Sequence, residues 1–193
     1  AFVGFGSAGG GVDQILAGDV DEIRVVVGHE GKRVRRELSD RNVSIISNPD
    51  YASGMLSSVR CGLAALPSEC RADLATLGDQ PSVTSKLIDQ MVRSFEATEK
   101  KILVPFYDGR RGHPVLFSAV YRDEILTSYD HVGLRGLLHA HSNDVFELSV
   151  PTSSVLSDMD YPQDYQRELG SIKRGNHGGK DSPHGKRVAH PTI

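Results

Sequence analysis

Residues 12–28 read VDQILAGDVDEIRVVVG, and the two apolar patterns in this stretch decide the fold class. Val12, Ile15 and Leu16 recur at helical spacing up to a break at Gly18. Residues 22–28 then form a short run of isoleucine and valines, which is typical of a strand buried on both faces. A helix that leads directly into a buried strand is a building unit of an α/β fold.

The same alternation continues toward the carboxyl end. The pattern predicts helices over 30–38 and 57–66, strands over 43–47 and 74–77, and a helix capped by Thr84 whose apolar residues follow helical spacing. Asn48 to Asp50 are expected to form a turn. Because strands that alternate with helices are joined by right-handed crossovers, we expect an α/β fold with a mainly parallel central sheet.

The remaining segments are less regular. A hairpin is expected from 102–107 and 114–117 around a glycine-rich turn at 108–112, followed by two short helices, a strand over 145–150 and a helix from Tyr161. We expect residues 1–11, which hold five glycines, to be irregular. Residues 12–170 are expected to form one domain, and residues 171–193 a disordered tail.

The composition points to a small-molecule partner. With 193 residues, 38% of them hydrophobic, the chain can bury a core of its own. A formal charge of −3 and a pI of about 6.2 give no reason to expect nucleic acid or membrane as a partner. Two cysteines and no long apolar run predict a soluble protein in the cytoplasm.

Asp79 follows the predicted strand over 74–77 directly. Open α/β sheets bind their ligands at the carboxyl ends of the strands, so a carboxylate there is well placed for Mg²⁺. The alternative is that Asp79 only turns the chain before Pro81.

A second acidic pair, Asp158 and Asp160, precedes Pro162. One aspartate from each loop can clamp a nucleoside triphosphate through magnesium. Capping of the following helix explains these residues equally simply.

Two further motifs carry polar groups suited to anions. Residues 54–62 (GMLSSVRCG) place Ser57, Ser58 and Arg60 at a helix N-terminus, where free N–H groups attract acceptor atoms, although plain N-capping by either serine is the alternative. Residues 110–114 (RRGHP) gather positive charge on a tight turn, which suits a phosphate but is also common on a solvated hairpin tip. His139 and His141 face different sides of their helix and do not predict a metal site.

Taken in order, several motifs resemble the bacterial molybdenum cofactor cytidylyltransferases and related nucleotidyltransferases. The resemblance runs from Asp13 to Tyr165 and rests on these segments: 25–29 (VVVGH), 48–49 (NP), 54–63 (GMLSSVRCGL), 77–81 (LGDQP), 109–117 (GRRGHPVLF), 133–138 (GLRGLL) and 158–165 (DMDYPQDY).

The resemblance implies a three-layer, Rossmann-like fold of glycosyltransferase-A type. It also implies transfer of CMP from CTP to molybdopterin, with release of pyrophosphate. Asp79 and Asp160 correspond to the residues that bind Mg²⁺. The resemblance places Gly54, Ser57, Ser58, Arg60 and Gly78 at the nucleotide, and Arg110, Arg111 and His113 at the acceptor.

The chain departs from the family at its start. Members open with a strand and a glycine-rich loop, followed by a lysine, that cradles the triphosphate. Residues 1–11 stand where the end of that region is expected, and no arginine or lysine precedes Arg24. We therefore expect the loop and the first strand to be missing, neighbouring strands to be left unpaired, and activity to be impaired unless the chain oligomerises.

Three rival functions remain open at this point. The base pocket is not evident in the sequence, so GTP is an alternative to CTP and a guanylyltransferase an alternative to a cytidylyltransferase. A sugar phosphate is a weaker alternative as acceptor. From another class, the chain is compatible with a non-catalytic protein that holds the molybdenum cofactor for delivery to a molybdenum enzyme.

Overall fold

The computed structural model describes residues 2–5, 9–77, 80 and 83–156. Its strands are β1 (Phe2–Phe5), β2 (Ile23–Val27), β3 (Ser44–Ser47), β4 (Ala72–Leu77), β5 (Ile102–Tyr107), β6 (Arg110–Arg111), β7 (Val115–Ser118) and β8 (Val145–Ser149). Its α-helices are α1 (Gly9–Leu16), α2 (Gly31–Glu37), α3 (Met55–Ala64), α4 (Ser85–Glu96), α5 (Arg122–Thr127) and α6 (Leu134–Ala140). Most of the elements predicted within these residues are confirmed to within a few residues.

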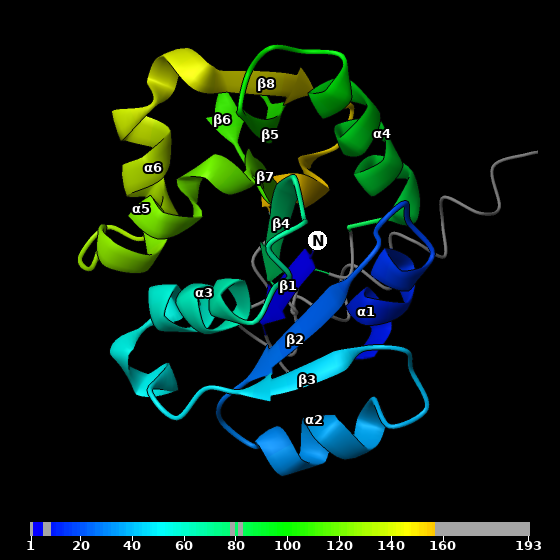
Figure 1. The fold of residues 1–193 in the computed structure, drawn as a ribbon. Helices are drawn as coiled ribbons and strands as arrows, with labels where there is room; N and C mark the ends of the chain where they lie inside the picture. Colours follow the sequence, from blue (N-terminus) through cyan, green and yellow to red (C-terminus); the bar gives the residue numbers. More distant parts are fainter. Residues whose placement is uncertain (1, 6–8, 78–79, 81–82, 157–193) are drawn as a thin grey trace, which may run out of the picture. The chain divides into compact units, whose positions relative to one another are not determined.

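All of these strands belong to one mixed sheet in the order β3-β2-β1-β4-β7-β5-β6, with β8 paired to β5 (Figure 1). The pairings β3–β2, β2–β1, β1–β4 and β5–β8 are parallel, as crossover connections require. The pairings β5–β7 and β5–β6 are antiparallel because they belong to the predicted hairpin, and β7 also pairs antiparallel with β4. The parallel half of the sheet therefore consists of β3, β2, β1 and β4, and it includes the strand that Asp79 follows in the sequence.

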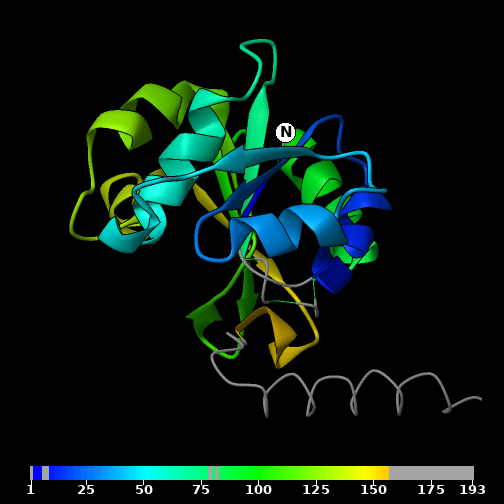
Figure 2. The same cartoon turned by 90° about the horizontal axis from the view of Figure 1, so that it is seen from below.

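Helices cover both faces of the sheet, which confirms the three-layer α/β class (Figures 1 and 2). On one face α1, α2 and α4 pack over a cluster that includes Val25, Val27 and Leu74. On the other face α3, α5 and α6 pack over a cluster that includes Val26 and Ala75. Neighbouring strand residues alternate between the two clusters, as the period of two in a strand demands.

The expectation for the N-terminus was wrong. Residues 2–5 form β1, which pairs with β2 on one side and β4 on the other, and α1 begins at Gly9. Glycine disfavours both elements by its intrinsic propensity, but hydrogen bonding to two neighbours overrides that preference. Because β1 is present, β2 and β4 are not left unpaired on the sides that face it. The connection at residues 6–8 lies outside the described residues.

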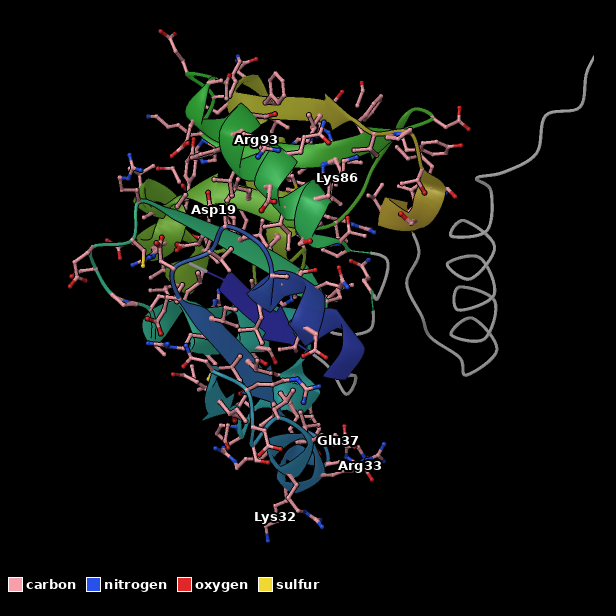
Figure 3. The ribbon with its side chains drawn as sticks, turned by 90° about the vertical axis from the view of Figure 1, so that its right-hand side faces the viewer. Asp19, Lys32, Arg33, Glu37, Lys86 and Arg93 are labelled. Carbon is pink, nitrogen blue, oxygen red and sulfur yellow. The ribbon has the colours of Figure 1, made fainter. Side chains whose placement is uncertain are left out.

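Thr84 caps α4 as predicted, because its hydroxyl accepts a hydrogen bond from the backbone N–H of Leu87 at 3.2 Å. The positive charges of α2 lie on its outer surface, where Arg33 pairs with Glu30 and Glu37 (Figure 3). Such exposed pairs are characteristic of a solvated helix face.

None of the helices in the described part of the chain is long and apolar enough to cross a membrane. The predicted helix from Tyr161 and the predicted tail 171–193 lie outside the described residues.

Candidate functional site

The carboxyl ends of β1, β2, β3 and β4 meet at one edge of the sheet, because these four strands are parallel neighbours. After β1 the chain moves outward through β2 to β3, and α3 then carries it back across to β4. The order of the strands therefore reverses between β1 and β4. A crevice at such a reversal is the usual ligand site of an open α/β sheet.

Asp79 comes two residues after Leu77, the last residue of β4, in the sequence. Gly78, Asp79, Asp158 and Asp160 themselves lie outside the described residues. Within the described ranges no group of three or more histidine, cysteine, aspartate or glutamate side chains is arranged to hold a metal ion. The two predicted metal-binding aspartates thus stay predictions.

The structure brings Ser57 and Ser58 together through Asn48, a residue to which the sequence assigned only a turn. The Asn48 side chain is 5% exposed, and its Nδ2 donates to both hydroxyl oxygens at 2.9 Å. Its Oδ1 accepts from the backbone N–H of Asp50, and its own N–H donates to Val27 at the end of β2. Asn48 therefore fixes the start of α3 to the carboxyl edge of the sheet.

N-capping by the serines, the alternative to ligand binding, is wrong. The N-cap of α3 is Gly54, which has φ 113° and no side chain to accept hydrogen bonds. No atom lies within 4 Å of where a Cβ would stand, so the backbone angle, rather than lack of space, requires glycine there. A helix N-terminus without a side-chain cap keeps N–H groups available for a ligand.

The guanidinium group of Arg60 makes hydrogen bonds within the protein. Its Nε donates to Ile125 O at 2.9 Å, its Nη2 to Ser128 O at 2.7 Å, and its Nη1 to the carboxylate of Asp130. All three guanidinium nitrogens are therefore used to join α3 to α5 and to the segment between α5 and α6. The geometry does not favour the predicted contact of Arg60 with a nucleotide.

The three predicted acceptor residues, Arg110, Arg111 and His113, line a single pocket of about 540 Å³. Hairpin residues form one wall. Helix α6 supplies the opposite wall with Arg135 and His139, which the sequence had not assigned to this site. Their spacing of four on a helix was the signal that places them on one face.

This pocket joins positive charge to an apolar lining. Arg110 and Arg135 make no ion pair with the described residues, whereas Arg111 donates to Glu147 at 2.7 Å. The apolar part of the lining consists of Val115, Leu134, Leu138, Val155 and Leu156. Such a pocket suits an anion that carries a flat or apolar body.

The pocket also lies beside the end of β4. Val115 pairs with Ala75 in antiparallel register, so the chain preceding Val115 runs toward the carboxyl end of β4. The backbone of Gly112 lies so close to Val155 that this corner requires glycine, because a Cβ there would stand 2.3 Å from the backbone oxygen of Val155. The backbone N–H of His113 donates to the same oxygen at 2.9 Å.

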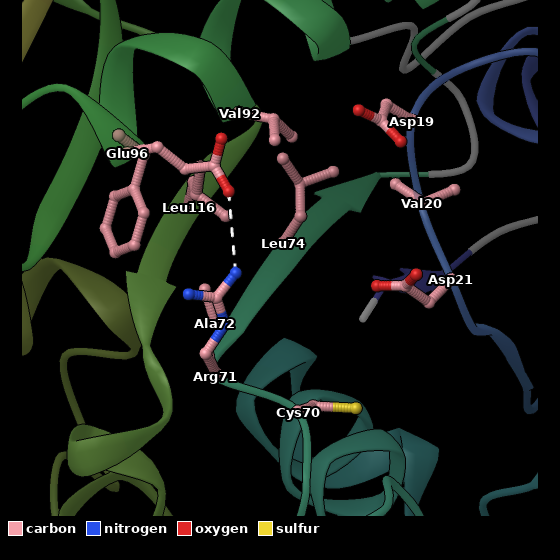
Figure 4. A pocket seen from close by; sticks show the side chains of 11 residues that line it. Asp19, Val20, Asp21, Cys70, Arg71, Ala72, Leu74, Val92, Glu96 and Leu116 are labelled. Atoms are coloured by element: carbon pink, nitrogen blue, oxygen red, sulfur yellow. Dashed lines mark hydrogen bonds and ion pairs between the residues drawn. The ribbon is translucent and has the colours of Figure 1, made fainter.

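A second pocket, of about 300 Å³, lies at the opposite edge of the sheet, where β2 and β4 begin. Figure 4 shows Asp19 and Asp21 on one side of it and Glu96 and Arg71 on the other. Three carboxylates and one guanidinium give this pocket a negative lining, which repels a triphosphate.

Comparison with known proteins identifies the family of the chain. Residues 12–145 match the family described as the MobA-like NTP transferase domain. The chain is 28% identical over 145 residues to the molybdenum cofactor cytidylyltransferase of Escherichia coli (strain K12), covering 74% of this chain and 71% of that protein.

Solved structures share the fold. The Mycobacterium tuberculosis H37Rv protein Rv0371c, in complex with manganese, superposes with a TM-score of 0.74 at 23% identity, over 88% of this chain and 97% of that one. A nucleotidyl transferase from Methanothermobacter thermautotroptrophicus superposes with a TM-score of 0.75 at 18% identity, over 91% and 98% of the two chains. Because the family match spans more than half of its length, this chain belongs to the MobA-like NTP transferase family and is a nucleotidyltransferase.

Proposed function

We propose that this protein transfers CMP from CTP to molybdopterin and releases pyrophosphate. The observation that carries the proposal is the arginine-lined pocket beside the carboxyl end of β4, the strand that Asp79 follows. A nucleotide at the β1/β4 reversal and a phosphate-bearing acceptor in this pocket are then neighbours. The similarity to the Escherichia coli cytidylyltransferase supports CTP and molybdopterin as the pair.

The nucleotide half of the proposed site is built on the start of α3. Gly54, Ser57 and Ser58 bind the base and ribose side of CTP, with Asn48 holding both hydroxyls in place. Gly78 and Asp79, which follow β4 in the sequence, are the proposed contacts of the phosphates. Arg60 supports this half by anchoring α3 rather than by touching the nucleotide.

Mg²⁺ is the proposed metal, with Asp79 and Asp160 as its protein ligands. Two carboxylates, completed by phosphate oxygens and water, form a donor set that suits this hard cation. When bound, the ion neutralises charge on the triphosphate. The Mycobacterium tuberculosis structure contains manganese, another divalent cation, in the same fold.

The acceptor half orients the attacking group. Arg110, Arg111 and His113, with Arg135 and His139 opposite, bind the terminal phosphate of the acceptor, and the leucines and valines take its ring system. An oxygen of that phosphate forms a bond to the α-phosphorus of CTP. The bond from this phosphorus to the bridging oxygen breaks, and pyrophosphate leaves with the electron pair. The protein contributes positioning and charge screening.

Isothermal titration with CTP and with GTP, each with magnesium, tests the nucleotide half. We expect micromolar binding of CTP, weaker binding of GTP, and loss of CTP binding in Asp79→Ala. Tighter binding of GTP would reassign the protein as a guanylyltransferase.

A turnover assay then tests the chemistry, with formation of pyrophosphate from CTP and molybdopterin as the readout. Molybdopterin binding without any nucleotide binding would favour a carrier that delivers the cofactor to a molybdenum enzyme. Turnover with a sugar phosphate in place of molybdopterin would contradict the proposed acceptor.

A further inference from the structure

Helix α6 forms one wall of the acceptor pocket but has only seven residues, and it begins after Gly133 at φ 62°. A helix of two turns is not stable by itself, so contacts outside it must set its position. Four of the residues that line the pocket belong to it: Leu134, Arg135, Leu138 and His139. The position of α6 therefore decides where the side chains of Arg135 and His139 stand in the pocket.

Glu124, on α5, contacts the chain on both sides of α6. Before the helix, the hydroxyl of Tyr129 donates to Glu124 Oε1. After the helix, Nε2 of His141, its C-cap residue, lies 3.0 Å from both carboxylate oxygens. One carboxylate thus joins the two ends of the helix to the neighbouring α5.

Packing makes the contact before α6 rigid. Tyr129 lies against Gly136, in the first turn of α6, where a Cβ would stand 2.3 Å from the Tyr129 ring. The Tyr129 carbonyl accepts from the N–H groups of Val132 and Gly133 at 3.1 and 2.9 Å. A shift of Tyr129 is therefore transmitted to the helix.

The contact after α6 is also enclosed. The His141 ring lies 4.6 Å, centroid to centroid, from Tyr121, whose hydroxyl donates to Asp144 at 2.6 Å. Hydrogen bonds from Tyr129 and from His141 lower the pKa of Glu124, so its carboxylate is ionised at neutral pH. The side chains of Tyr121, Tyr129, His141 and Asp144 are not part of the lining of the acceptor pocket.

We propose that Glu124 is a positioning residue for acceptor binding: it holds α6 at both ends and so places Arg135 and His139 in the pocket wall. The inference rests on the acceptor half of the proposed function. It predicts that loss of the Glu124 carboxylate weakens acceptor binding without weakening nucleotide binding.

The test compares phenyl phosphate, a phosphate monoester with a flat apolar ring, with CTP and magnesium. Binding of each is measured by titration of the backbone amide signals in nuclear magnetic resonance spectra. We expect Glu124→Ala to weaken phenyl phosphate binding by about 5- to 30-fold and to leave CTP binding within about twofold, since coupling through a network of contacts is of this size. Tyr129→Phe, which breaks one of the two contacts, should have a smaller effect of the same kind.

Two controls make the result specific. Asp123→Asn removes a charge from the same helix at an exposed position and should change neither affinity. Glu124→Gln keeps the shape of the side chain, so it reports on the carboxylate if Glu124→Ala does not fold, and it should weaken phenyl phosphate binding by at least fivefold.

Three outcomes overturn the proposal. Unchanged phenyl phosphate binding in both Glu124 variants, with a loss in Arg135→Ala, leaves the pocket in place but removes the role of Glu124. Equal weakening of both ligands gives Glu124 only a role in stability. Failure of the wild type to bind phenyl phosphate removes the acceptor pocket and this inference together, while CTP binding in the same sample preserves the nucleotide half.

Discussion

At the scale of single residues, the polar side chains with the most definite roles are those that the structure buries in shared contacts. Asn48, Glu124 and Tyr129 each bind partners that the sequence does not place beside them. Their effects are therefore measurable one residue at a time.

Tyr129 is predicted to stay protonated far into the alkaline range. Burial, and then the hydrogen bond to the Glu124 carboxylate, raise its pKa from 10.0 to about 12. Because the folded pKa exceeds the unfolded one, the stability that it contributes is complete below about pH 10 and is lost as pH rises through about 12.

Ultraviolet titration of tyrosinate, with Tyr129→Phe subtracted from wild type, measures this pKa. Glu124→Gln should move it back toward 10. A Tyr129 that titrates with the exposed tyrosines would contradict the buried contact.

Asn48→Ala is predicted to destabilise the protein by about 1–3 kcal/mol, because it leaves polar groups at the start of α3 and in the 48–50 turn without their partner. Urea denaturation measures the change in the free energy of unfolding. Asn42→Ala, at an exposed position in the preceding turn, is the matched control and should change stability by no more than about 0.5 kcal/mol. Equal effects of the two substitutions would remove the proposed role of Asn48.

At the scale of elements, a buried ion pair joins the start of β4 to the start of α5. Asp73, with 0% of its side chain exposed, accepts two hydrogen bonds of 2.7 Å from Arg122, whose third nitrogen donates to Pro67 O at 2.7 Å. Asp73→Ala leaves the guanidinium without its partner and should cost about 3–5 kcal/mol of unfolding free energy.

The exposed pair Arg71–Glu96 is the control for this measurement. Its side chains are 89% and 58% exposed, so Glu96→Ala should cost less than about 1 kcal/mol. A small effect of Asp73→Ala, comparable with that of Glu96→Ala, would show that the buried pair does not hold β4 and α5 together.

The hairpin corner offers a second test at this scale. Gly112→Ala places a methyl group against the Val155 backbone and should cost about 1–3 kcal/mol. It should also shift the amide signals of residues 153–156 and weaken phenyl phosphate binding. Gly109→Ala, at φ 75° with open space around it, costs about 1–2 kcal/mol from backbone strain alone and should leave that segment in place.

At the scale of the whole molecule, ligand binding and stability are linked. If CTP with magnesium binds the folded chain alone, a concentration of 100 times Kd stabilises it by about 2.7 kcal/mol. For a chain of this size the melting temperature should rise by about 5–10 °C. Differential scanning calorimetry measures the shift, and Asp79→Ala should abolish it; an equal shift in that variant would contradict the proposed metal site.

Much of the architecture could be predicted because it depends on local patterns. The valine run of residues 23–27 and the apolar spacing of residues 87–95 each specify one element whatever its neighbours are. Strand β1 could not be predicted in this way. Its four residues are stabilised by pairing with β2 and β4, which are distant in sequence.

In the candidate site, too, some features follow from local sequence and others only from tertiary contacts. By itself the sequence determined the α/β class and the basic hairpin turn, and it predicted the carboxyl edge of the parallel strands as the place for ligands, because each depends on chain order and residue type. Only the tertiary structure decided that Asn48 binds Ser57 and Ser58, that Arg60 is structural, and that α6 completes the hairpin pocket. These contacts join segments up to 70 residues apart, and their geometry is set by packing of the elements, which no local pattern encodes.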